Sequence, residues 1–359
     1  MLIIDAHLDL SMNALQGNRD LLKSAYTIRA SETGMAGPGR GQGTVALPEL
    51  RRGRIALCFA TLIARSTGRP IPYIDFATPA QAFGMARGQL AYYRALERQG
   101  HIRVIADRAS LDEHIAAWEA WDADPNADPT TSPPLGFAIS MESADPILSP
   151  DELQEWWDLG LRVIGPSHYG PGRYGGGTST ELGLTDIGGP LLDAMDRVGM
   201  ILDLTHFSDQ AFWQAMDRFN GPVLASHNNC RALVPQQRQF DDDQLRALIA
   251  RDAVIGSAFD VWMLKLGFVS GVSSNASIGL EKIVDHVDHI CQLAGNTRHV
   301  AIGSDLDGGY GREQSPHDLD TIADLQKLGP LLSARGYSDD DIAGFFHGNW
   351  LRLLRRVWK

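Results

Sequence analysis

The sequence has few cysteines and no long hydrophobic run, and both features narrow what the chain can be. Its three cysteines, Cys58, Cys230 and Cys291, are widely spaced and odd in number, so they form neither a disulfide framework nor a paired zinc knuckle. No segment reaches the roughly 18 consecutive apolar residues of a membrane span. The N-terminal residues include neither a basic region nor a small-residue cleavage site. We therefore expect a reducing compartment and a cytoplasmic location.

Positive charge is also scarce. The 32 Lys and Arg residues are outnumbered by 44 Asp and Glu residues, which gives a net charge of −12. This balance disfavours nonspecific binding to nucleic acid or to an anionic membrane. We expect a small molecule or a peptide as the partner, with no nucleic acid and no membrane. The sequence leaves the oligomeric state open, a homodimer included.

Short apolar runs of the length typical of buried parallel strands alternate with longer helical or loop stretches. The eight runs are residues 2–5, 55–62, 136–140, 161–165, 200–204, 222–225, 254–258 and 300–303. Residues 102–106 form a ninth candidate, which fits the edge of a helix–loop segment before a polar insert. The length of 359 residues would also accommodate two domains. Eight alternations instead predict an α/β fold, a single (β/α)8 TIM-type barrel domain over residues 1–359 with loop insertions.

Three segments account for part of the extra length. Residues 34–43 are rich in glycine, and residues 122–134 are rich in Asp, Pro and Thr, so both are predicted surface loops. Residues 170–177 are also rich in glycine and follow the fourth predicted strand. This composition predicts a flexible loop that could form a lid.

Polar side chains follow six of the eight runs directly. They are His7 and Asp9 after the first run, Glu142 after the third, His168 after the fourth, His206 after the fifth, His227 after the sixth, and Asp305 and Asp307 after the eighth. In a barrel of this type the catalytic residues come from the C-terminal ends of the strands. We expect these side chains to meet at one end of the barrel.

Five of them are candidate metal ligands. His7 and Asp9 are two residues apart, so in extended backbone their side chains point to the same side. Glu142 follows an apolar run and needs a buried partner, for which a metal and a salt bridge are the alternatives. His206 and His227 lie at neighbouring strand ends. Five ligands are too many for one catalytic zinc with an open position, but they suit two divalent metal ions that share a carboxylate and hold an attacking hydroxide.

The remaining strand-end residues suit the chemistry of hydrolysis. Asp305 could move the proton of the attacking water to a leaving amine, or it could be a sixth ligand. Asp307, beside two glycines, is expected to hold its loop. His168 could donate a hydrogen bond to an oxyanion, or stabilise a loop. Arg231 and Arg238 both offer a guanidinium for a substrate carboxylate, with surface solvation as the alternative.

Taken together and in this order, these residues resemble the membrane dipeptidase (renal dipeptidase) family of dinuclear zinc peptidases. The resemblance covers most of the chain and rests on residues 5–9, Glu142, His168, His206, Ser226-His227 with Arg238 eleven positions later, residues 303–308 and residues 348–352.

The resemblance implies two zinc ions, although zinc, manganese and cobalt accept the same ligands. His7, Asp9 and Glu142 would bind one ion, and Glu142, His206 and His227 the other.

The resemblance also implies roles for three residues beside the metals. His168 would polarise the scissile carbonyl, Arg238 would hold the C-terminal carboxylate, and Asp305 would shuttle the proton. Members of the family cleave dipeptides, often with a D-residue at the C-terminal position, and some open β-lactam rings. The implied activity is therefore that of a metal-dependent dipeptidase.

Two departures limit what carries over from the family. Eukaryotic relatives are secreted and lipid-anchored, whereas we expect no membrane attachment here. Asp260 stands after the seventh predicted strand, where an aromatic hydroxyl is expected near the substrate. Our hypothesis is that Asp260 favours a substrate amine or a basic side chain.

Two other functions compete with the dipeptidase interpretation. One is another amidohydrolase acting on N-acyl amino acids or cyclic amides, although such enzymes usually open with HxH and often use a modified lysine as the bridge. The other is a barrel that binds metal or peptide without turnover, which would need no Asp305.

Overall fold

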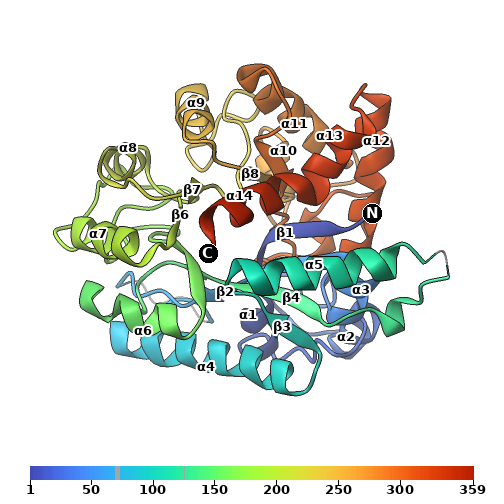
Figure 1. Cartoon of the computed structure of the whole chain (residues 1–359), viewed down its shortest axis with the longest axis horizontal. Helices are drawn as coiled ribbons and strands as arrows, with labels where there is room; N and C mark the ends of the chain where they lie inside the picture. Colours follow the sequence, from blue (N-terminus) through green and yellow to red (C-terminus); the bar gives the residue numbers. More distant parts are fainter. Residues whose placement is uncertain (69–72, 125) are drawn as a thin grey trace.

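The computed structural model describes residues 1–68, 73–124 and 126–359. Eight parallel strands form a nearly closed barrel with helices around it, which confirms the predicted fold class (Figure 1). The strands of the barrel are β1 (Ile3–Leu8), β2 (Ile55–Ile63), β4 (Leu135–Glu142), β5 (Leu161–Gly165), β6 (Ile201–Asp203), β7 (Val223–Leu224), β8 (Ile255–Ser257) and β9 (Val300–Ile302). Their order is β7-β6-β5-β4-β2-β1-β9-β8. A single parallel bridge between Ala225 and Ile255 joins the two ends of this order.

The ninth candidate run is a strand, so its interpretation as a helix–loop edge is wrong. β3 (Ile102–Val104) pairs in parallel with Leu135–Phe137 at the start of β4, while β5 pairs with the later residues of β4. Because β2 occupies the other edge of β4, β3 and β5 share one edge. β3 therefore extends the sheet below β5 without adding a position to the barrel.

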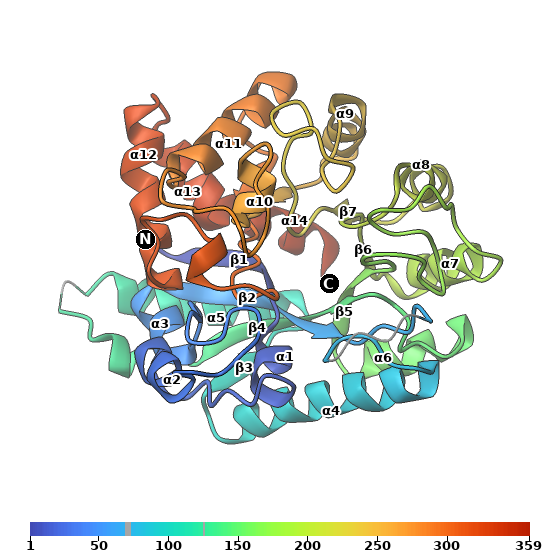
Figure 2. The same ribbon diagram turned by 180° about the vertical axis from the view of Figure 1, so that it is seen from behind.

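The long strands form because both of their faces are covered. Every residue of β1, β2 and β4 is buried, as expected for parallel strands between a barrel interior and a layer of helices. Figure 2 shows the helices around the strands from behind. They are α1 (Leu10–Leu15), α2 (Ala25–Ser31), α3 (Leu47–Arg52), α4 (Pro79–Arg98), α5 (Arg108–Asp122), α6 (Leu153–Asp158), α7 (Gly188–Val198), α8 (Asp209–Arg218), α9 (Asp242–Ala250), α10 (Val261–Leu264), α11 (Glu281–Ala294), α12 (Leu328–Ala334), α13 (Asp339–Ala343) and α14 (Asn349–Val357).

The helix ends follow local sequence signals. Thr78, Asp107 and Asp241 accept backbone N–H groups at the starts of α4, α5 and α9, each within a reciprocal capping box. The last helix, α14, docks on the barrel because the Trp350 indole donates to the Ile302 carbonyl at 2.9 Å and Asn349 donates to the Val300 carbonyl at 2.8 Å. No helix within the described residues is both long enough and apolar enough to cross a membrane.

The three predicted loop segments agree with the structure to different degrees. Of the predicted loop 34–43, residues 34–38 are exposed and residues 39–43 are buried or half-buried. Residues 123–134 are mostly exposed, residue 125 lying outside the described part of the chain. Residues 174–177 are buried, and the Tyr174 hydroxyl donates to the Ile147 carbonyl at 2.6 Å. A Cβ on Gly177 would lie 1.8 Å from the His168 carbonyl oxygen. These glycines thus allow close backbone packing in the second half of the predicted loop 170–177, while its flexibility and its role as a lid stay predictions.

Candidate metal centre

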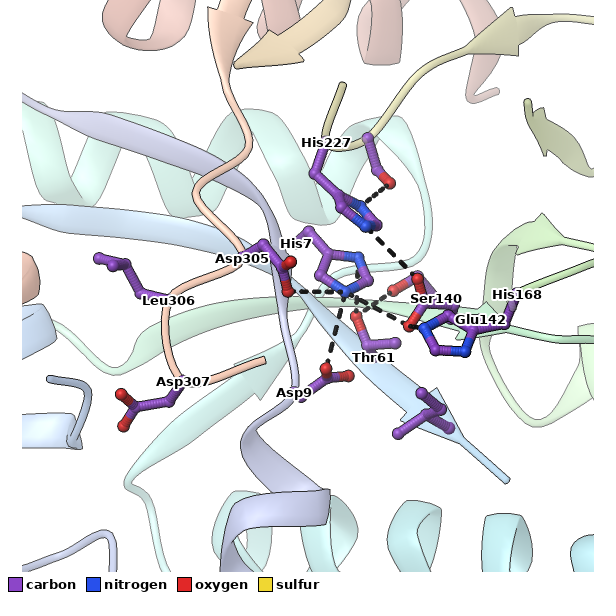
Figure 3. A network of polar contacts seen from close by, with 12 residues as sticks. His7, Asp9, Thr61, Ser140, Glu142, His168, His227, Asp305, Leu306 and Asp307 are labelled. Atoms are coloured by element: carbon purple, nitrogen blue, oxygen red, sulfur yellow. Dashed lines mark hydrogen bonds and ion pairs between the residues drawn. The ribbon is translucent and has the colours of Figure 1, made fainter. Parts of the chain in front are cut away.

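The C-terminal ends of the strands bring the five candidate ligands together, and Figure 3 shows four of them, His7, Asp9, Glu142 and His227. His7 belongs to β1 and Glu142 is the last residue of β4, whereas His206 and His227 follow β6 and β7. Nε2 of His7 lies 3.8 Å from Asp9 Oδ2 and 3.7 Å from Glu142 Oε2. On the other side, Oε1 of Glu142 lies 3.2 Å from His206 Nε2 and 3.4 Å from His227 Nε2. Glu142 thus faces two ligand groups, one with each carboxylate oxygen.

Three overlapping sets of side chains have ligand atoms within 4.8 Å of one another. They are His7, Asp9 and Glu142; Glu142, His206 and His227; and His7, His227 and Asp305. The first two sets contain the ligands expected for each of two ions. The third set keeps Asp305 within ligand range, since its Oδ1 lies 3.8 Å from His7 Nε2. The arrangement is therefore compatible with either interpretation of Asp305.

The buried polar atoms at this centre fit a cation. His7 Nε2, Asp9 Oδ1 and Glu142 Oε1 are buried and have no hydrogen-bond partner within the part of the chain that the structure describes. Leaving a carboxylate buried and unpaired is costly. Nitrogen and carboxylate oxygen are ligands that zinc, manganese and cobalt accept. The residues present thus fit divalent metal ions.

Hydroxyl groups orient each candidate imidazole ligand. The distances from hydroxyl oxygen to ring Nδ1 are 3.5 Å for Thr61 and His7, 3.0 Å for Thr178 and His206, and 2.8 Å for Ser226 and His227. In every case Nε2 is left facing the carboxylates. Partners of this kind fix the orientation of a metal-binding histidine and the ring nitrogen that it presents.

Two buried aspartates join neighbouring strand ends beneath the ligands. Asp5 Oδ1 accepts the backbone N–H groups of His7 at 3.2 Å and Ser304 at 2.8 Å, and Asp203 Oδ1 accepts those of Thr205 and Ser226, both at 3.0 Å.

His206 and Asp305 have left-handed backbone conformations, with φ of 69° and 57°. Non-glycine residues held in this region carry strain and concentrate at functional sites.

Burial and neighbouring charged groups together shift the pKa values of the centre. Burial lowers the pKa of His206 and His227 well below the ordinary value, helped by Arg238 beside His206 and by His7 beside His227. Both rings are therefore neutral, the form that binds a metal. Burial also raises the pKa of Glu142 to about 7. A cation between the ligands would favour the charged carboxylate and reverse this shift.

A cavity of about 430 Å³ opens onto the centre. Its lining includes Asp9, Glu142, His168, His206, His227, Arg238, Asp260 and Asp305, together with Arg65, Tyr169 and the apolar side chains of Met12, Ile63, Ile74 and Met263. The cavity thus joins four of the five candidate ligands with the other predicted site residues, whereas His7, Arg231 and Asp307 are not in its lining.

The two arginines that compete for a substrate carboxylate differ in their surroundings. Arg238 is 4% exposed, and its Nη2 donates to the His227 carbonyl at 3.0 Å. Its Nη1 finds no hydrogen-bond partner among the described residues. Arg231 instead makes an ion pair with Asp209 at 2.6 Å. Arg238 therefore lines the cavity and keeps one buried terminal nitrogen without a partner among the described residues, whereas the Arg231 guanidinium is already paired.

Asp260 and Asp307 differ in a similar way. Asp260 lines the cavity, and its Oδ1 accepts the Trp262 N–H and the Gln314 amide, both at 2.8 Å. Asp307 is turned away from the ligands (Figure 3) and accepts Thr44 N and Oγ1, both at 2.7 Å. It also lies 3.3 Å from Arg19 Nη1. Asp307 thus holds its loop, as the neighbouring glycines indicated.

The sequence reasoning missed Arg65 and Tyr169. Arg65 follows β2, and its Nη1 lies 2.7 Å from His168 Nδ1. Arg65 stands shortly after the second predicted run, and the same kind of position predicts the other site residues. Tyr169 follows His168 directly, and its ring lies 5.1 Å from that of His206.

Residues 1–359 match the family model described as membrane dipeptidase (peptidase family M19). An uncharacterized protein in the pqqA 5′ region of Klebsiella pneumoniae is 32% identical over 216 residues, which cover 58% of this chain and 76% of that protein. An uncharacterized dipeptidase of Schizosaccharomyces pombe is 30% identical over 215 residues, 59% of this chain and 49% of that protein. The matched region thus spans about half the length of the second relative.

Two solved structures share the fold over the whole chain. The structure of a dipeptidase described as a metallo peptidase of family M19 has a TM-score of 0.80 at 24% identity and covers 100% of this chain and 99% of its own. A metallo peptidase from Rhodobacter sphaeroides, liganded with a phosphinate mimic of the dipeptide L-Ala-D-Ala, has a TM-score of 0.75 at 24% identity with the same coverage.

Proposed function

The chain belongs to the membrane dipeptidase family, peptidase family M19, and from this membership we propose that it is a dinuclear metal-dependent dipeptidase whose substrates include L-Xaa-D-Xaa dipeptides. The observation that carries the proposal is the position of Glu142, whose two carboxylate oxygens face separate groups of ligands. A shared carboxylate can bridge the two ions of a two-metal hydrolase, a role that a single-metal site does not have.

We assign the ligands to two zinc ions. His7, Asp9 and Glu142 would hold one, and Glu142, His206 and His227 the other, in agreement with two of the side-chain groups around the centre. When bound, the ions supply the positive charge that makes a water molecule nucleophilic at neutral pH and polarises a peptide carbonyl.

The residues around the ligands bind the dipeptide and move the proton. Arg238, which lines the cavity, would hold the C-terminal carboxylate through its guanidinium. His168 would donate a hydrogen bond from Nε2, which lies 3.7 Å from Glu142 Oε2, to the carbonyl oxygen as negative charge develops there. Asp305, at the same centre, would accept the proton of the attacking water and pass it to the leaving amine.

Asp260 would select the substrate side chain or amine. Its carboxylate lines the same cavity as Arg238, so a cationic group on the substrate would reach an opposite charge there. The inclusion of L-Xaa-D-Xaa dipeptides among the substrates is supported by the solved relative from Rhodobacter sphaeroides, whose ligand mimics L-Ala-D-Ala.

The decisive experiment compares dipeptides with acylated amino acids. The zinc-loaded protein is assayed with L-Ala-D-Ala, L-Ala-L-Ala, N-acetyl-D-alanine and a cyclic amide, alongside protein stripped by a chelator and the Glu142→Gln variant. We expect hydrolysis of the dipeptides only, and little activity in both controls. Faster hydrolysis of N-acetyl-D-alanine or of the cyclic amide than of either dipeptide would identify a different amidohydrolase. Binding of metal and dipeptide without turnover would identify a non-catalytic barrel.

A further inference from the structure

We propose that Arg65 is a positioning residue that holds His168 in one tautomer, with the ring proton on Nε2 and that nitrogen facing the metal centre. Arg65 follows β2 at the same end of the barrel as the ligands and is only 3% exposed. Its Nη1 lies 2.7 Å from His168 Nδ1 and donates to the Tyr169 carbonyl at 3.1 Å. The guanidinium therefore contacts both the His168 ring and the backbone carbonyl of the next residue.

The chemistry of the guanidinium decides where the ring proton lies. Arginine carries five N–H donors and no acceptor, so His168 Nδ1 must accept in this pair. A neutral imidazole with an accepting Nδ1 carries its proton on Nε2. That nitrogen lies 3.7 Å from Glu142 Oε2. The N–H group of the ring is thus aimed at the centre.

Arg65 is itself held in place by the segment that follows it. Its Nη2 lies 3.3 Å from Asp75 Oδ2. Asp75 in turn accepts the backbone N–H of Thr67 at 3.0 Å and its hydroxyl at 2.6 Å. The backbone of Arg65 pairs with this segment as well, since its N–H donates to the Ile74 carbonyl at 2.7 Å. A fixed chain of contacts therefore runs from Asp75 through Arg65 to His168.

The consequence for catalysis rests on the proposed function, in which Nε2–H of His168 donates to the substrate carbonyl. Without Arg65 the ring could turn or place its proton on Nδ1, which would remove that donor. Loss of a partner that orients a metal-binding histidine typically costs about 10- to 100-fold in activity, and we expect a loss of the same size when His168 loses Arg65. We expect Arg65→Met to lower kcat by this factor and to change KM by less than about threefold, because Arg238 still binds the carboxylate.

The direct test reads the tautomer by long-range ¹H–¹⁵N NMR of the histidine rings in the zinc-loaded protein. The His168 signals are assigned by their loss in His168→Gln. We expect the Nε2–H pattern in the unmodified protein and in Arg65→Lys, which keeps a donor at this place, and loss of that single pattern in Arg65→Met. The control is Arg173→Met, which removes another partly buried arginine that donates to backbone carbonyls. It should leave the His168 pattern unchanged.

The outcomes separate this inference from the proposed function. An Nδ1–H pattern for His168 in the unmodified protein overturns the inference without any variant. An unchanged Nε2–H pattern together with unchanged kcat in Arg65→Met also overturns it. If the tautomer follows Arg65 as expected but no dipeptide is hydrolysed, the positioning role stands and the proposed reaction fails.

Discussion

Replacing Arg238 by methionine is expected to abolish recognition of a substrate carboxylate while the metal ligands stay in place. The guanidinium is 4% exposed and lines the cavity beside the ligands. Of its two terminal nitrogens, Nη2 donates to the His227 carbonyl, and only Nη1 is free of partners within the described residues. Methionine fills a similar length of the site but cannot donate a hydrogen bond.

The expected magnitude follows from the burial of this group. Truncating one partner of a buried, hydrogen-bonded charge pair costs about 2–5 kcal/mol. Since about 1.4 kcal/mol corresponds to a tenfold change in rate, kcat/KM should fall by about 30- to 5000-fold. Most of the loss should appear in KM if the carboxylate is held equally in the ground state and the transition state.

The assay compares L-Ala-D-Ala with its C-terminal amide in both proteins. The unmodified protein should prefer the acid by about the same 30- to 5000-fold factor, and Arg238→Met should hydrolyse acid and amide at similar rates. The matched control is Arg231→Met, since Arg231 is paired with Asp209 at 2.6 Å; it should keep the preference for the acid. An Arg238→Met protein with its full metal content and an undiminished acid-to-amide ratio would refute this assignment.

Three further substitutions test other parts of the site. Asp305→Ala should lower kcat by about 100-fold or more, the usual weight of a general acid–base, with metal content by mass spectrometry unchanged; loss of a metal ion would make Asp305 a ligand instead. Burial raises the pKa of Asp260 to about 6, so its negative charge develops as pH rises through that value. Preference for a lysine over a norleucine dipeptide should therefore grow between about pH 5 and about pH 8 and stay flat in Asp260→Asn; a flat profile in the unmodified protein would contradict the role of Asp260. Asp307→Ala should lower the free energy of unfolding by about 1–3 kcal/mol in urea titrations, because the Thr44 N–H and hydroxyl lose a buried acceptor while Arg19 keeps its ion pair with Glu32; a loss under about 0.5 kcal/mol would show that Asp307 does not hold its loop.

Much of the barrel could be predicted because its strands are buried on both faces. A strand such as β2 shows this burial as a long apolar run that only Thr61 interrupts. β3 has only three residues, of which one is buried, so its sequence could not separate a strand from the edge of a helix. Its pairing depends on the long strand β4, which lies more than thirty residues away in the chain.

The part of the candidate site that lies at the ends of the strands could be predicted from the sequence. His7, Glu142 and His227 stand at such ends, and the parallel order of the strands brings them together. The hydroxyl of Thr178 could not be predicted as a partner of His206, because a buried loop carries it there. The glycines of that loop indicated flexibility in the sequence, whereas in the structure they permit tight packing. Contacts of this kind depend on the path that a loop takes in the folded protein. Unlike a helix or a strand, a loop has no periodic pattern of residues in the sequence from which its path could be predicted.

Titration of metal-free protein with zinc tests the two-metal centre most directly. Protein stripped by a chelator is loaded stepwise, and bound zinc and hydrolysis of L-Ala-D-Ala are measured at each step. Because Glu142 faces two ligand groups, activity should rise until two zinc ions are bound per chain and then stay constant. Full activity with only one bound ion, or two bound ions without hydrolysis of any dipeptide, would contradict a dinuclear dipeptidase.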